Sequence, residues 1–90
     1  MAYKKPKKEN VTLYYPKDYP GTRIIKKFKK PRSPRTKIFA CSDKDNWFVD
    51  VLDVKTRSKE VADDEGWITM KDVPQWTSWY KRLGWEEVKD

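Results

Sequence analysis

The segment from Thr36 to Val54 constrains the fold more than any other part of the chain. Residues 36–41 and 47–54 are rich in β-branched and aromatic side chains, and the turn-forming residues 42–46 separate them. Two such segments around a short polar turn predict an antiparallel hairpin. In the second segment apolar residues occupy both alternating faces, so we expect a central strand that is covered on both sides.

Further strands and one helix are expected around this hairpin. The helix begins after Asp72, and Gly84 fits the position that ends it. Its apolar stripe is expected at Trp76, Trp79, Tyr80 and Leu83, which follow at helical spacing. Residues 63–66 are expected to form a tight turn. The other expected strands are 11–15, 23–30, 59–62, 67–70 and 85–88.

These elements predict an α+β fold class. We expect a small antiparallel sheet of about four to six strands, either open or barrel-like, with one C-terminal α-helix packed on it. The domain is expected to cover residues 11–90 and to follow a flexible basic tail at residues 1–10. No internal repeat is visible, so a single small domain is the expected organisation.

Composition excludes several kinds of protein. The chain has 90 residues, one Cys and no His, which excludes a His-based catalytic triad and an intrachain disulfide framework. A structural zinc site would lack ligands, and we expect no metal and no cofactor. No run of about 18 apolar residues is present, and no apolar stretch follows the basic N-terminus. We therefore expect a cytoplasmic protein without a membrane span.

The net charge of +7 is divided unequally along the chain. Residues 1–37 contain 13 Lys and Arg against two acids, a net charge of +11, whereas residues 38–90 contain eight against 12, a net charge of −4. The densest run is 23–37, with eight cations among 15 residues and no acid. Pro31 and Pro34 favour extended backbone, so residues 29–36 are expected to form a basic, solvent-exposed loop.

A basic segment beside aromatic rings is typical of nucleic-acid binding. Clustered cations attract phosphates and release their counterions, and rings beside them can stack on unpaired bases. The predicted helix lacks a basic face, which disfavours major-groove readout and slightly favours RNA over DNA. We therefore expect a non-catalytic nucleic-acid-binding protein. Its phosphate contacts are predicted at Arg23, Lys26, Lys27, Lys29, Lys30, Arg32, Arg35 and Lys37, and its stacking contacts at Tyr15, Tyr19 and Phe28.

A first alternative function uses the tryptophans. The chain has five Trp, and most are expected in the core because large rings dominate small cores. Any that remain on the surface would favour a homodimer or a partner protein, since Trp is a common interface anchor. The alternative is therefore a small accessory protein, of the kind that bacteriophages encode, which binds a host protein and inhibits or redirects it.

A second alternative is a small Mg²⁺-dependent nuclease. Asp53-Val54-Lys55 near the end of a predicted strand, with Asp43 or Asp45 before it, resembles the active-site pattern of restriction-type nucleases. The resemblance implies two carboxylates that hold Mg²⁺ and a lysine that helps to activate water. The Pro that usually precedes the first carboxylate is missing, and Asp50 and Asp53 fall on opposite faces of a regular strand.

Overall fold

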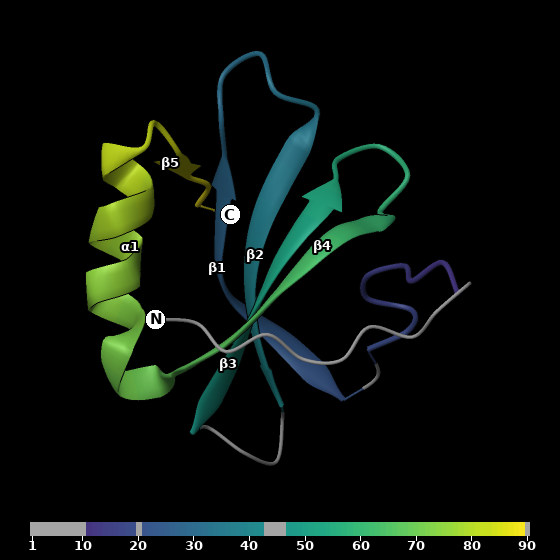
Figure 1. Ribbon diagram of the computed structural model, residues 1–90, viewed down its shortest axis with the longest axis horizontal. Coiled ribbons are helices and arrows are strands. Elements are labelled where there is room, and N and C mark those ends of the chain that lie inside the picture. The colour runs from purple at the N-terminus through teal and green to yellow at the C-terminus, as the bar shows by residue number, and fades with distance from the viewer. Residues whose placement is uncertain (1–10, 20, 43–46, 90) are drawn as a thin grey trace.

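The computed structural model describes residues 11–19, 21–42 and 47–89 (Figure 1). Its strands are β1 (Thr22–Lys29), β2 (Arg35–Ser42), β3 (Phe48–Lys55), β4 (Val61–Thr69) and β5 (Glu86–Glu87). Between β4 and β5 lie a short 3-10 helix, η1 (Met70–Asp72), and helix α1 (Val73–Arg82). The five strands form one antiparallel sheet in the order β4-β3-β2-β1-β5. The expected α+β class, with one C-terminal helix on an antiparallel sheet, is confirmed.

The hairpin expected from the sequence is formed by β2 and β3. Ile38 lies opposite Leu52, and Phe39 lies opposite Val51. Phe39 and Val51 contribute to one buried cluster, whereas Ile38 and Leu52 contribute to the other. Both faces of this hairpin are therefore covered, as the two apolar faces of the second segment predict. The predicted turn residues 43–46 lie outside the described part of the chain.

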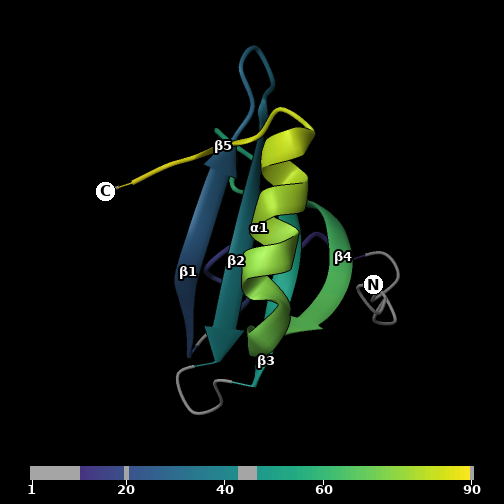
Figure 2. The same ribbon diagram turned by 90° about the vertical axis from the view of Figure 1, so that its left-hand side faces the viewer.

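Helix α1 covers one face of the sheet (Figure 2). Val73, Thr77 and Tyr80 are its buried residues, and the Tyr80 ring lies 5.6 Å from the Phe39 ring, centroid to centroid. The expected apolar stripe is only partly correct, because Trp79 and Leu83 are 48% and 46% exposed. The line of α1 that meets the sheet runs through Val73, Thr77 and Tyr80, so Trp79 lies off this line and is exposed.

The N-terminal segment covers the opposite face. Tyr15 packs on the cluster that contains Ile38 and Leu52, and the Tyr19 ring lies 6.0 Å from the Tyr15 ring. The strand expected at residues 11–15 is reduced to an isolated bridge between Tyr14 and Glu60. This segment stays on the sheet with only one bridged pair of residues, because the burial of its aromatic rings holds it there.

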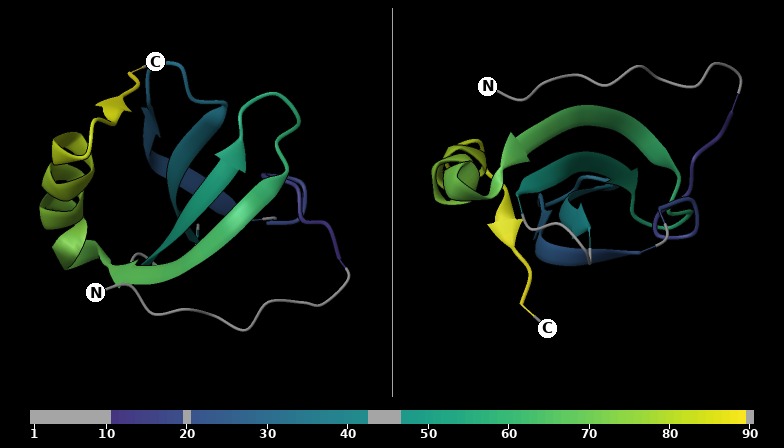
Figure 3. Two further views of the ribbon diagram at one scale, coloured as in Figure 1. Left: turned by 45° about the horizontal axis from the view of Figure 1, so that its top comes forward. Right: turned by 90° about the horizontal axis from the view of Figure 1, so that it is seen from below.

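Strand β4 differs most from expectation. The predicted strand 59–62, tight turn 63–66 and strand 67–70 are in fact one strand, Val61–Thr69. Register shifts leave Ala62 and Glu65 as extra residues opposite β3. Such bulges bend a strand and raise its twist, and Figure 3 shows β4 strongly curved. The polar run therefore follows the bend of an edge strand instead of reversing the chain.

The ends of α1 and of β1 also adjust the expected boundaries. Gly84 adopts a φ of 98°, which favours glycine and ends the helix as predicted. The expected basic loop 29–36 is shorter than predicted, because β1 extends to Lys29 and β2 begins at Arg35. Residues 30–34 form a tight turn, in which the Ser33 N–H donates to the Lys30 carbonyl at 3.1 Å.

Candidate nucleic-acid interface

Two turns meet at one end of the sheet. Figure 1 shows the β1–β2 turn (residues 30–34) and the β3–β4 turn (residues 56–60) on the same side. The Thr56 N–H donates to the Pro34 carbonyl at 2.8 Å, and the hydroxyls of Thr36 and Thr56 lie 2.8 Å apart. These contacts hold the two turns side by side, although about 20 residues of chain separate them.

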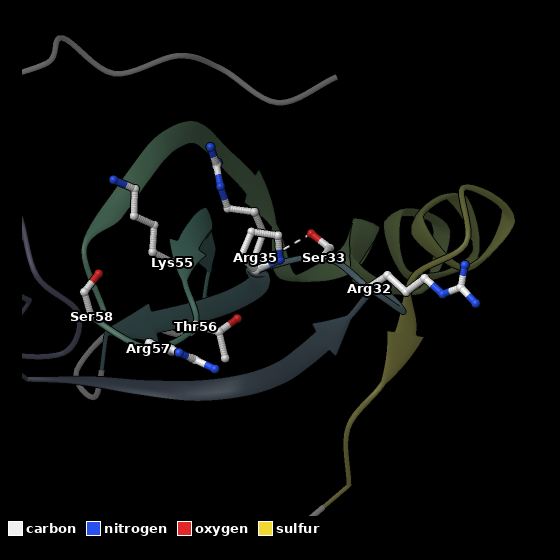
Figure 4. A pocket seen from close by; sticks show the side chains of 8 residues that line it. Arg32, Ser33, Arg35, Lys55, Thr56, Arg57 and Ser58 are labelled. Atoms are coloured by element: carbon white, nitrogen blue, oxygen red, sulfur yellow. Dashed lines mark hydrogen bonds between the residues drawn. The ribbon is translucent and has the colours of Figure 1, made fainter.

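A hollow of about 760 Å³ lies between the turns (Figure 4). Its charged lining is Arg32, Arg35, Lys55 and Arg57, and the remaining lining residues are uncharged. We define the basic end as residues 29–35 and 55–60, which carry seven cations and one acid, Glu60. The cations are Lys29, Lys30, Arg32, Arg35, Lys55, Arg57 and Lys59. This is a concentrated positive surface on a small domain.

The cations of the basic end differ in their partners. Arg35 is paired with Asp53 at 3.2 Å, and Lys55 is paired with Glu60 at 3.1 Å. Arg32 and Arg57 are exposed, and neither has an ion-pair partner within the described ranges. These two guanidinium groups are therefore available to an external anion.

Each of the two turns places a cation in the left-handed backbone region. Arg32 has a φ of 63° and Lys59 a φ of 61°. Glycine adopts this conformation without penalty, whereas an L side chain costs roughly 1–2 kcal/mol. Both turns thus carry a long cationic side chain at a position where it lowers stability.

Lys37 is not part of this surface, which corrects the sequence prediction. Its side chain is buried, and its Nζ is 2.5 Å from Glu65 Oε1 and 4.9 Å from the centre of the Tyr80 ring. The Tyr80 hydroxyl donates to the other Glu65 oxygen at 2.9 Å. Lys37 shares its side of β2 with Phe39, and that side faces α1. A phosphate cannot reach it there.

Burial shifts the pKa of two groups in this internal network. It raises the pKa of Asp53, against the opposing effects of Lys37 and Arg35. Burial and then the Glu65 charge raise the pKa of Tyr80. One Asp53 oxygen is engaged by Arg35, and the described residues contain no group of three acidic, Cys or His side chains that could hold a metal. Asp43 and Asp45, the other carboxylates of the nuclease pattern, lie outside the described residues.

The aromatic residues predicted to stack on bases are mostly internal. Phe28 is fully buried and Tyr15 is 4% exposed, so neither can meet a base, and both predictions are corrected. Phe28 alternates inward on β1 and packs on Phe39, with ring centroids 5.2 Å apart. Tyr19 is partly buried, and its hydroxyl lies in the protein interior. The rings beside the cations in sequence therefore build the two core faces.

The remaining predicted cations lie along β1. Arg23 lies near the start of β1, at the other end of the strand from Lys29. Its Nε donates to Cys41 Sγ at 3.2 Å. Lys26 is paired with Glu87 at 3.2 Å, and Lys27 is partly buried. Of the eight predicted phosphate contacts, the structure brings together Lys29, Lys30, Arg32 and Arg35 at the basic end.

Sequence reasoning missed the second half of the basic end. Lys55, Arg57 and Lys59 are three cations within five residues, a pattern visible in the chain. The hairpin register places Lys55 opposite Arg35, and only this pairing shows that the three cations lie beside the β1–β2 turn. The hairpin was predicted without a register, so this pairing could not be predicted from the sequence.

In the part of the chain that the structure describes, no helix is long and apolar enough to cross a membrane. Comparisons of the chain with family models, with curated proteins and with solved structures find no match. The case for a function therefore depends on the geometry and charge of the basic end.

Proposed function

We propose that the protein binds nucleic acid through the basic end, without catalysing a reaction. The observation that carries this proposal is the gathering of seven cations at the basic end, four of which, Arg32, Arg35, Lys55 and Arg57, line one hollow. A polyphosphate is the ligand class that gains most from such a surface, because each neutralised phosphate releases condensed counterions. RNA is favoured slightly over DNA, because the described residues contain no basic helix face suited to the major groove of DNA.

The side chains around the hollow suit phosphate oxygens. Arginine presents a planar fork of donors that can hold a phosphate through two parallel hydrogen bonds. Ser33 and Ser58 add hydroxyl groups to the lining of the hollow. Hydroxyl and guanidinium donors of this kind fix a backbone in position without reading its bases. We expect binding that depends strongly on salt and only weakly on sequence.

The backbone conformation of the turns supports the same function. Arg32 and Lys59 occupy left-handed positions that glycine would adopt more easily. Strained positions are retained where the side chain has a role that outweighs its cost to stability. Cations at the tips of both turns satisfy that condition if they contact a polyanion.

Fluorescence anisotropy with a labelled 12-nucleotide RNA tests the proposal. The double variant Arg32→Gln with Arg57→Gln removes the two cations that lack an acidic partner and should weaken binding about tenfold or more at low salt. The matched control, Lys17→Gln with Lys71→Gln, removes the same charge from exposed positions outside the basic end and should change affinity much less. Equal losses of RNA affinity in the two variants would show that only the net charge matters, and would overturn the proposed site.

A further inference from the structure

We infer that the ligand is single-stranded, and that one of its bases stacks on Trp79 of α1, next to Arg82. This inference rests on the proposed function and extends it from a phosphate-binding end to a ligand class. It replaces the stacking residues expected from the sequence, of which Tyr15 and Phe28 are buried.

A second hollow lies on the outer face of α1. It has a volume of about 660 Å³, and its lining residues are Gln75, Trp76, Ser78, Trp79 and Arg82. Trp79 is 48% exposed, and it lies three residues before Arg82, so the two side chains share one side of the helix. A ring beside a guanidinium group is the combination that stacks on a base and contacts its phosphate.

The charge of the helix favours a polyanion. Val73–Arg82 contains no acidic residue. Lys81 is engaged by Glu87 at 3.5 Å, whereas Arg82 is exposed and has no ion-pair partner within the described ranges. The hollow therefore offers one available positive charge and an indole face, with no carboxylate from the helix to repel a phosphate.

The C-terminal end of α1 lies near the basic end. The C-terminal end of α1 lies on the same side of the molecule as the β1–β2 turn (Figure 1). Lys30 Cε would lie only 3.5 Å from a Cβ placed at Gly84, and Lys30 Nζ lies 5.8 Å from the centre of the Trp85 ring. Arg82 is two residues before Gly84. A strand that leaves the basic end past Lys30 therefore meets Arg82 and then Trp79.

The exposed indole selects for a single strand. Bases in a duplex are paired and stacked on each other, so a ring on the outside of a helix cannot reach their faces without opening the duplex. Unpaired bases stack on such a ring whatever their identity. A duplex would use the basic end alone, whereas a single strand would use the basic end and Trp79.

The test compares Trp79→Ala with the control Trp47→Ala on single-stranded RNA and on a duplex of the same length. Trp47 is 76% exposed and lies before β3, at the end of the sheet away from the basic end. Trp79→Ala should weaken single-strand binding about 5- to 100-fold. It should leave duplex binding and the salt dependence of single-strand binding unchanged, and Trp47→Ala should change neither affinity.

Trp79→Phe gives a second readout. It retains a ring and should keep most of the affinity, while the quenching of tryptophan fluorescence on addition of RNA should decrease. Full single-strand affinity of Trp79→Ala would overturn the stacking inference, yet leave the proposed function intact. Equal weakening for RNA and duplex would also overturn it. Failure of the unmodified protein to bind either ligand would instead refute the proposed function.

Discussion

The salt dependence of binding gives a quantitative prediction for the basic end. Of its seven cations, Arg35 and Lys55 already have carboxylate partners. Five then remain for phosphates: Lys29, Lys30, Arg32, Arg57 and Lys59. For single strands the slope of log K against log salt is about −0.7 per neutralised phosphate, which gives about −3.5 for these five contacts.

The double variant Arg32→Gln with Arg57→Gln leaves three such contacts and a slope of about −2.1. Between 50 and 200 mM salt, affinity should fall about 100-fold for the unmodified protein and about 20-fold for the variant. The difference between the slopes, about 1.4, does not depend on how many other cations also contact the ligand. Lys17→Gln with Lys71→Gln is the control with the same net charge.

Fluorescence anisotropy titrations at five salt concentrations measure these slopes. An Arg32/Arg57 variant that keeps the slope of the unmodified protein would refute the proposed phosphate contacts, because those residues would then release no counterions. The same reduction in slope in the Lys17/Lys71 control would equally refute them. A parallel loss of affinity at every salt concentration would indicate a contact other than phosphate neutralisation.

Three further predictions concern residues outside the basic end: Phe28, Glu65 and Glu87. Phe28→Leu should lower the free energy of unfolding by about 1–2 kcal/mol and leave RNA affinity unchanged. A folded variant with weaker RNA binding would instead indicate that Phe28 contacts the RNA. Glu65→Gln should lower the free energy of unfolding by about 2–3 kcal/mol, because it leaves the Lys37 charge buried without its partner. Adding Lys37→Met to this variant should recover most of the lost stability, as measured by urea unfolding. The pKa of Glu87 is lowered below its ordinary 4.5, chiefly by its hydrogen bond from Lys26. The ionised carboxylate therefore stabilises the fold fully above pH 4.5, and this contribution is lost as the pH falls through the lowered pKa. Glu87→Gln should therefore be less stable than the unmodified protein at pH 7 but not in strong acid. Glu86→Gln, which removes the exposed neighbouring carboxylate, is the matched control.

Local pattern was sufficient for the hairpin and for the end of the helix. Alternation and β-branched residues placed β2 and β3 correctly, and Gly84 ended α1 as predicted because only a residue tolerant of positive φ fits there. The same rules failed for β4. Its acidic run resembles a turn in sequence, and the bulges at Ala62 and Glu65 that accommodate it depend on pairing with β3.

The site was predicted in part for a related reason. Lys37 lies within the predicted strand 36–41 and has the same strand parity as Phe39, so alternation alone could have placed it inside. Lys55 and Arg57 gained meaning only from the register that brings the two turns together. The exposure of Trp79 depends on which line of α1 meets the sheet, and Val73, Thr77 and Tyr80 decide that line through packing.

The most direct test of the central claim is an NMR titration of ¹⁵N-labelled protein with a 12-nucleotide RNA. The account predicts that the largest amide shift changes fall in the two turns, residues 30–34 and 56–60, and that smaller changes extend to residues 79–85 at the C-terminal end of α1. Residues 67–72 at the opposite end should be unaffected. Changes concentrated at residues 67–72, or no saturable change at all, would contradict the account.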